Sequence, residues 1–324
     1  MVQTATMDLN IIGQTPRQRG LLGVEKVTLG YTIFTTLVIF LVWGRMTAPS
    51  QLIYGRALVV AGIAATCLVY RMAPCRLTLL LRYFFPLSLL AYWYPDTYEF
   101  CQLFPNLDHV FAAADLMLFG FQPSISFSRT VSTKLWSELF HMAYFSYYPL
   151  IALTILVPLF TDTRKFGRTA FIVLTSFFLY YLIYLFLPVA GPQYYFHAIG
   201  LDAAQNGVYP HIGDYFRTHT EMLGPAGTDG FFRELVESAQ ESGERPTAAF
   251  PSSHVGISTI LMLLLRDNKR AVMWCVMPLY VLLCCSTVYI EAHYFVDVVG
   301  GLATAFVFYW ATARLYPKME RITL

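Results

Sequence analysis

Long runs of apolar residues, separated by short polar stretches, dominate this chain of 324 residues. A helix needs about 20 consecutive apolar residues to cross the hydrocarbon core of a bilayer. Eight runs meet or approach that length, so the pattern predicts an all-α polytopic membrane protein with about eight transmembrane helices. The predicted spans are residues 27–43, 57–70, 77–94, 137–160, 169–189, 253–265, 271–290 and 294–315. The second and sixth runs are short, and we expect those helices to extend beyond their apolar parts.

The composition agrees with a membrane protein. Hydrophobic residues make up 56% of the chain and charged residues only 13%, whereas soluble domains average about 25% charged residues. The net charge is +2 and no basic run stands out, so nucleic acid is not an expected partner. The six cysteines show neither CxxC nor Cys/His metal spacing, and we interpret them as small core residues.

Basic residues occupy every second loop between the predicted spans. They are Arg71 and Arg76, then Arg164, Lys165 and Arg168, then Arg266, Lys269 and Arg270, and finally Arg314, Lys318 and Arg321. Because lysine and arginine favour cytoplasmic loops, both termini are predicted to be cytoplasmic, although Arg45 and Arg56 argue mildly the other way. Residues 1–26 lack the features of a signal peptide and are predicted to form a cytoplasmic tail, with 27–324 as a single membrane domain.

The same topology places two polar segments on the extracytoplasmic side. The long loop 190–250 is rich in glycine, proline and charge, and is a natural cover for a site. In residues 101–128, charged positions such as Asp108 and Asp115 alternate with apolar ones, which predicts an amphipathic helix in the membrane interface. Asp115 and residues 118–124 could shape a lipid access route or simply anchor this helix.

Two short motifs begin apolar runs in the last quarter of the chain. They are Pro251-Ser252-Ser253-His254 and His293-Tyr294-Phe295-Val296-Asp297. Ionisable groups are costly in such surroundings and usually have a task. His293 and Asp297 are four residues apart, so they share one face of a helix and can touch. By the predicted topology, both motifs lie on the extracytoplasmic side, at the depth of the lipid headgroups.

Two histidines and an aspartate suit phosphoryl transfer through a phosphohistidine, which depends mainly on positioning and charge stabilisation. In this interpretation His293 is the nucleophile, Asp297 holds its far nitrogen, and His254 protonates the leaving group. Backbone N–H groups around Ser252 and Ser253 can hold phosphate oxygens. Taken singly, each residue has a simpler explanation, such as an interfacial histidine or a helix-capping serine, but the combination favours a catalytic site. The hypothesis requires no metal and no cofactor.

Five further residues are candidates for substrate binding. Glu138 and His141, followed by Tyr148, lie near the outer end of the fourth span, where a substrate contact and an internal hydrogen-bonded pair are equally plausible. Gln193 follows the fifth span and could bind a phosphate or a sugar, or belong to a plain turn. Arg245, six residues before Pro251, could be a phosphate-binding cation or a solvated loop charge.

The two motifs resemble signatures of the type 2 phosphatidic acid phosphatases. Pro251-Ser252-Ser253-His254 is similar to the second signature, Pro-Ser-Gly-His, with Ser253 in the glycine place. Residues 286–297 resemble the third signature, Ser-Arg-x5-His-x3-Asp, with Thr287 in the arginine place. No Lys-x6-Arg-Pro first signature is present upstream. The His-Tyr-x-x-Asp form is more similar to a related branch, which contains the inositol phosphorylceramide and sphingomyelin synthases, and the resemblance covers roughly residues 138–315.

The resemblance implies a six-helix core and the same roles for His254, His293 and Asp297. In the synthase branch a phosphorylated headgroup moves from a phospholipid donor to the hydroxyl of a ceramide-type acceptor, and His254 then acts as a base on that hydroxyl. We therefore expect headgroup transfer between membrane lipids. One alternative is hydrolysis of a lipid phosphate or lipid pyrophosphate by the same residues. The other is a non-enzymatic lipid transporter, although two matching halves with polar groups at mid-membrane are not evident.

Overall fold

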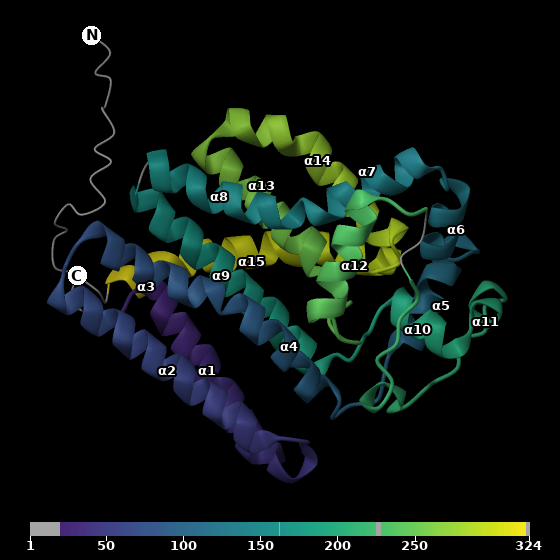
Figure 1. Cartoon of the computed structure of the whole chain (residues 1–324), viewed down its shortest axis with the longest axis horizontal. Coiled ribbons are helices and arrows are strands. Elements are labelled where there is room, and N and C mark those ends of the chain that lie inside the picture. Colours follow the sequence, from purple (N-terminus) through teal and green to yellow (C-terminus); the bar gives the residue numbers. More distant parts are fainter. Residues whose placement is uncertain (1–19, 162, 225–227, 322–324) are drawn as a thin grey trace. The chain divides into compact units, whose positions relative to one another are not determined.

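The structure is a computed structural model that describes residues 20–161, 163–224 and 228–321. Every regular element in this part of the chain is a helix, as the apolar pattern predicts (Figure 1). Most of the predicted tail, residues 1–19, lies outside the described residues. The first helix begins at Gly23, four residues before the predicted start of the first span.

The contacts divide the chain into two compact units. The first contains residues up to Tyr92, Ile155–Thr175 and the segment from Ala311, and the second contains Trp93–Thr154 and Ser176–Trp310. Helices α1, α2 and α3 pack against one another in the first unit (Figure 1). Their bounds are Gly23–Val42, Pro49–Met72 and Arg76–Ser88.

A buried ion pair lies inside the first unit. The Arg82 guanidinium donates to both carboxylate oxygens of Glu25, at 2.7 and 2.6 Å, and both side chains are at most 2% exposed. The ring of Tyr70 lies 5.2 Å from the Arg82 guanidinium carbon. Each charge is therefore compensated locally, as a charged group between apolar helices requires.

Among the residues that the structure describes, seven helical segments are long and apolar enough to cross a membrane, or eight if one bent pair counts as a span. The seven segments coincide with the predicted spans one to five, seven and eight. They include α7–α8 (Lys134–Phe145 and Tyr147–Thr161), α9 (Thr163–Phe186), α14 (Arg270–Tyr289) and α15 (Phe295–Arg321). The predicted sixth span forms α13, Ser253–Asn268, which has only 16 residues.

The segment 101–128, predicted to form an amphipathic helix, is helical but divided into separate helices. Helix α4 (Leu90–Cys101) ends there, and α5 (Asp108–Phe119) and α6 (Pro123–Thr130) follow, bent by 63° relative to each other. Gly120 allows the bend because it ends α5 at φ 73°, in the left-handed region that favours glycine. Asp108 and Asp115 do not face water, since both are fully buried.

The second unit places α13 beside α14, and α7 beside both α14 and α12 (Phe231–Gly243) (Figure 1). The predicted loop 190–250 is not a featureless cover. It contains α12 and also the short helices α10 (Pro192–Ile199) and α11 (Leu201–Gln205). The packing of α12 on α7 brings the end of this loop back to the start of α13.

Candidate active site

The two motifs form the starts of two adjoining helices. Ser252 caps α13, and its Oγ accepts a hydrogen bond from Val255 N at 3.4 Å. Asp297 lies in the first turn of α15, and its Oδ2 accepts from Tyr294 N at 2.8 Å. Ser252 N donates to the backbone oxygen of Asp297 at 3.0 Å. This last bond ties the two helix starts directly to each other.

Glycine contacts allow α13 and α15 to approach closely. A Cβ added to Gly301 would lie 2.5 Å from the Ser252 carbonyl oxygen and 3.4 Å from Gly256 N. A Cβ added to Gly256 would lie 3.0 Å from the Gly301 oxygen. Backbones this close leave no room for side chains, as in other small-residue contacts between membrane helices. The contact begins within three residues of His254.

The imidazoles of His254 and His293 lie next to one another, edge to face. Their ring centroids are 5.8 Å apart, with the planes inclined at 64°. The His254 ring packs against two tyrosines of α7–α8, with centroid distances of 4.6 Å to Tyr144 and 4.5 Å to Tyr147. These contacts restrict the His254 ring, and His293 is 4% exposed.

His293 is held mainly by a backbone carbonyl. Its Nδ1 lies 2.9 Å from the oxygen of Ala249 and 3.5 Å from Asp297 Oδ2. Because a carbonyl oxygen can only accept, Nδ1 carries the proton and the neutral ring keeps its lone pair on Nε2. Burial lowers the pKa of His293 to about 4, although the Ala249 bond works in the opposite direction. The ring is therefore neutral at pH 7, with an unprotonated Nε2.

Sequence comparison identifies the family to which these motifs belong. A sequence model of the PAP2 superfamily matches residues 109–311, more than half of the chain. The chain belongs to the PAP2 superfamily. This confirms the family resemblance that the two motifs indicated.

Part of this PAP2 chain is similar in sequence to a curated protein, the inositol phosphorylceramide synthase catalytic subunit aur1 of Schizosaccharomyces pombe (strain 972 / ATCC 24843). The two sequences are 29% identical over 131 residues, which is 40% of this chain. The matched part spans only 29% of the relative's length. No solved structure matches the chain significantly.

Three of the predicted substrate-binding residues line one narrow pocket with both histidines. They are Ser253, Gln193 and Arg245. Among the described residues that line this pocket, Arg245 supplies the only lysine or arginine side chain. The third signature of this chain has Thr287 in place of the arginine. The Thr287 hydroxyl donates to the Cys284 oxygen at 2.8 Å.

Glu244 also lines the pocket, and sequence reasoning missed it. Its carboxylate accepts hydrogen bonds from Gln193 Nε2 at 2.8 Å and from the Tyr144 hydroxyl at 3.3 Å. Burial raises the pKa of Glu244, and these bonds oppose the rise. Nothing in the sequence singles out this residue among the many charges of the 190–250 segment. Its place in the pocket is evident only from the structure, in which α12 ends at Gly243, directly before Glu244.

The remaining predicted residues lie apart from the pocket. Glu138 accepts from the backbone N–H groups of Phe232 and Arg233, at 3.1 and 3.2 Å, and so caps α12. His141 Nδ1 lies 2.7 Å from the Ser137 oxygen, one turn earlier. Tyr148 is 53% exposed. The fully buried Ser252 serves as a cap, so its side chain is already engaged.

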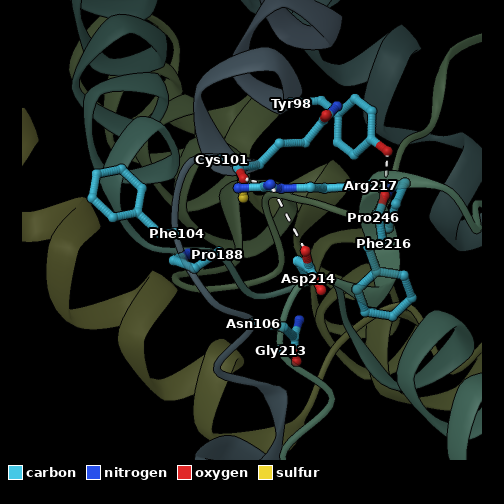
Figure 2. Close-up of a pocket in the computed structure, with 11 residues that line it drawn as sticks. Tyr98, Cys101, Phe104, Asn106, Pro188, Gly213, Asp214, Phe216, Arg217 and Pro246 are labelled. Carbon is cyan, nitrogen blue, oxygen red and sulfur yellow. Dashed lines mark hydrogen bonds and ion pairs between the residues drawn. The ribbon is translucent and has the colours of Figure 1, made fainter. Parts of the chain in front are cut away.

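Two other features of the described residues bear on ligands. No group of three or more histidine, cysteine, aspartate and glutamate side chains in this part of the chain could hold a metal ion. A separate pocket, shown in Figure 2, is lined by Tyr98, Asn106 and Arg217, among others. Arg217 there donates to the Gln102 oxygen at 2.9 Å. This second pocket contains neither candidate catalytic histidine.

Proposed function

We propose that this PAP2 protein transfers a phosphorylated headgroup from a phospholipid to the hydroxyl of a ceramide-type lipid, through a phosphohistidine on His293. The observation that supports this most directly is the pair of adjacent imidazoles, 5.8 Å between centroids, with Nδ1 of His293 engaged by the Ala249 oxygen. That arrangement leaves Nε2 free to attack phosphorus. The second imidazole, His254, is the proposed proton donor to the leaving oxygen.

In the first half of the reaction, Nε2 of His293 forms a bond to phosphorus while the bond from phosphorus to the donor lipid's oxygen breaks. Protonated His254 gives its proton to that oxygen. Asp297 stabilises the positive charge that develops on the His293 ring. Arg245 and the unpaired N–H groups in the first turn of α13 hold the equatorial phosphate oxygens.

In the second half, the hydroxyl of the acceptor lipid attacks the phosphohistidine. Neutral His254 takes the hydroxyl proton, the N–P bond breaks, and His293 returns to its starting state. Because His254 gives one proton and later takes one, the cycle needs no other proton donor. Water in place of the acceptor lipid would turn the same site into a phosphatase, and PAP2 membership supports this second candidate.

Two observations favour a lipid acceptor over water. The partial likeness is to a protein named as an inositol phosphorylceramide synthase subunit. Threonine also stands in the arginine place of the phosphatase signature.

The alternating basic loops support a site on the extracytoplasmic side with both termini cytoplasmic. A transporter without catalysis has no need for two adjacent imidazoles.

The test is to reconstitute the full chain with labelled ceramide and a panel of phospholipids, and to identify the products by mass. The expected result is a labelled sphingophospholipid, with phosphate trapped on His293. Phosphate release without acceptor would identify the phosphatase instead. His293→Ala should abolish both reactions, whereas His197→Ala, at an exposed position of α10, should leave them unchanged. Activity that survives His293→Ala would refute the mechanism.

A further inference from the structure

Helix α5 carries two buried carboxylates that take no part in the proposed reaction. Asp108 and Asp115 are both 0% exposed. Seven residues apart, they lie two turns apart along the same face of the helix. Neither lines the pocket that contains His254 and His293. Buried carboxylates are costly unless they are fully hydrogen-bonded, and the bonds of both lead to the candidate catalytic segments.

Asp108 accepts four hydrogen bonds. Its Oδ2 accepts from Ala190 N at 2.7 Å and from Asn106 Nδ2 at 2.5 Å. Its Oδ1 accepts from Gly191 N at 2.8 Å and from the Tyr294 hydroxyl at 2.9 Å. One carboxylate therefore joins the segment that precedes α10 to the residue directly after His293.

The same carboxylate is also linked, through two backbone segments, to the carbonyl that contacts the His293 ring. Val189, next to the two residues whose N–H groups Asp108 holds, accepts from Ala249 N at 2.9 Å. The Ala249 oxygen in turn lies 2.9 Å from His293 Nδ1. Asp108 thus fixes both the chain that carries His293 and the chain that supplies its carbonyl partner. A shift of either segment would turn the imidazole away from His254.

Asp115 holds the start of α15. Its two oxygens accept from Phe295 N at 2.8 Å and from Val296 N at 3.0 Å. These N–H groups belong to the first turn of the helix, where no intrahelical carbonyl is available. A carboxylate there is also favoured by the helix dipole. The bonds fix the helix between His293 and Asp297.

We propose that Asp108 and Asp115 are positioning residues of the active site, which act through His293 by holding its ring toward His254. This inference rests on the proposed function. It makes α5, which lies outside both catalytic motifs, a part of the catalytic apparatus.

The test compares Asp108→Asn and Asp115→Asn with Asp202→Asn, a matched control at an exposed position of α11. An asparagine keeps the size but turns an N–H donor toward at least one of the donors that the carboxylate accepts. We expect kcat for phosphohistidine formation to fall about a hundredfold in both variants, with KM little changed, since displacing a reacting group by about 1 Å has that effect. Asp202→Asn should match the wild type.

Tyr294→Phe separates the two arms of the Asp108 network. It removes one of the four donors and leaves Ala190 and Gly191 in place, so its kcat should fall less than that of Asp108→Asn. Thermal unfolding in detergent is recorded for each variant, and kcat is expressed per folded molecule. A fall in kcat that merely follows the folded fraction would mean a structural role only, and would overturn the proposal.

An activity-independent readout separates this inference from the proposed function. The chain has seven histidines, and the Nδ1–H signal of ¹⁵N-labelled His293 is assigned by its loss in His293→Ala. That signal should move in Asp108→Asn and stay unchanged in Asp202→Asn. If the wild type neither transfers nor hydrolyses, the proposed function fails while the signal still reports on positioning. An unmoved signal in both α5 variants would sink the inference even in an active enzyme.

Discussion

Gly301→Ala should slow the proposed reaction by separating the two helices that carry the candidate catalytic groups. A Cβ added to Gly301 would lie 2.5 Å from the Ser252 carbonyl oxygen and 3.3 Å from Val255 Cβ. Ser252 is the residue that caps α13, two positions before His254. The obstructing atom belongs to the backbone, so no side-chain rotation can relieve the contact. The helices themselves must move apart.

The size of the effect follows from that geometry. Ordinary van der Waals contact for an added Cβ begins at 3.4 Å, and 3.4 minus 2.5 leaves 0.9 Å to be gained by displacement. A misplacement of about 1 Å between reacting groups can cost about a hundredfold in rate, which corresponds to about 2.7 kcal/mol in activation free energy. Overpacking in a close contact should also destabilise the fold by about 1–3 kcal/mol.

The assay is the rate of phosphohistidine formation per folded molecule, together with the melting temperature in detergent. Gly30→Ala in α1 is the matched control, because nothing lies within 4 Å of its added Cβ. That control should keep the wild-type rate and melt at the same temperature or higher, since alanine favours a helix over glycine. If Gly301→Ala keeps its rate within about twofold, the link between helix separation and rate is wrong.

Three further outcomes are expected from the charged groups. In the proposed mechanism only the neutral His293 ring attacks, so phosphohistidine formation should slow as the pH falls through about 4; since the same step needs protonated His254, the rate should also fall towards high pH. An acid limb near the ordinary histidine value of about 6.5 would contradict the burial argument. Burial raises the pKa of Glu291 from 4.5 to about 7, so its ionisation destabilises the fold progressively as the pH rises from 4.5 through 7. Glu291→Gln should therefore melt higher than the wild type at pH 8 and equally at pH 4.5, and a constant difference across that range would refute the assignment. Arg82→Met leaves Glu25 buried without its cation and should lower the unfolding free energy by about 3–5 kcal/mol, most of which Glu25→Leu in the same chain should restore, as measured by thermal unfolding.

The helices could be predicted from the sequence because the bilayer imposes their length and apolar character. The pairing of His254 with His293 could also be predicted. Both residues begin apolar runs, and the loop charges predict that both runs begin on the same side of the membrane. The burial of Asp108 and Asp115 could not be predicted from the sequence, for a physical reason. Alternation of charged and apolar positions shows only that two faces differ, and unpaired backbone N–H groups satisfy a carboxylate as well as water does. Those donors come from residues more than 80 positions away.

The carbonyl that orients His293 could not have been predicted from any side-chain pattern. Every residue type has a backbone oxygen, so the identity of Ala249 carries no signal, and replacing its side chain does not remove the acceptor. The orientation is instead encoded in what fixes the path of residues 189–191 and 249, which includes the bond from Ala249 N to Val189 and the carboxylate of Asp108. The side chain whose replacement most directly disturbs this carbonyl therefore lies at position 108, on a helix outside both candidate catalytic motifs.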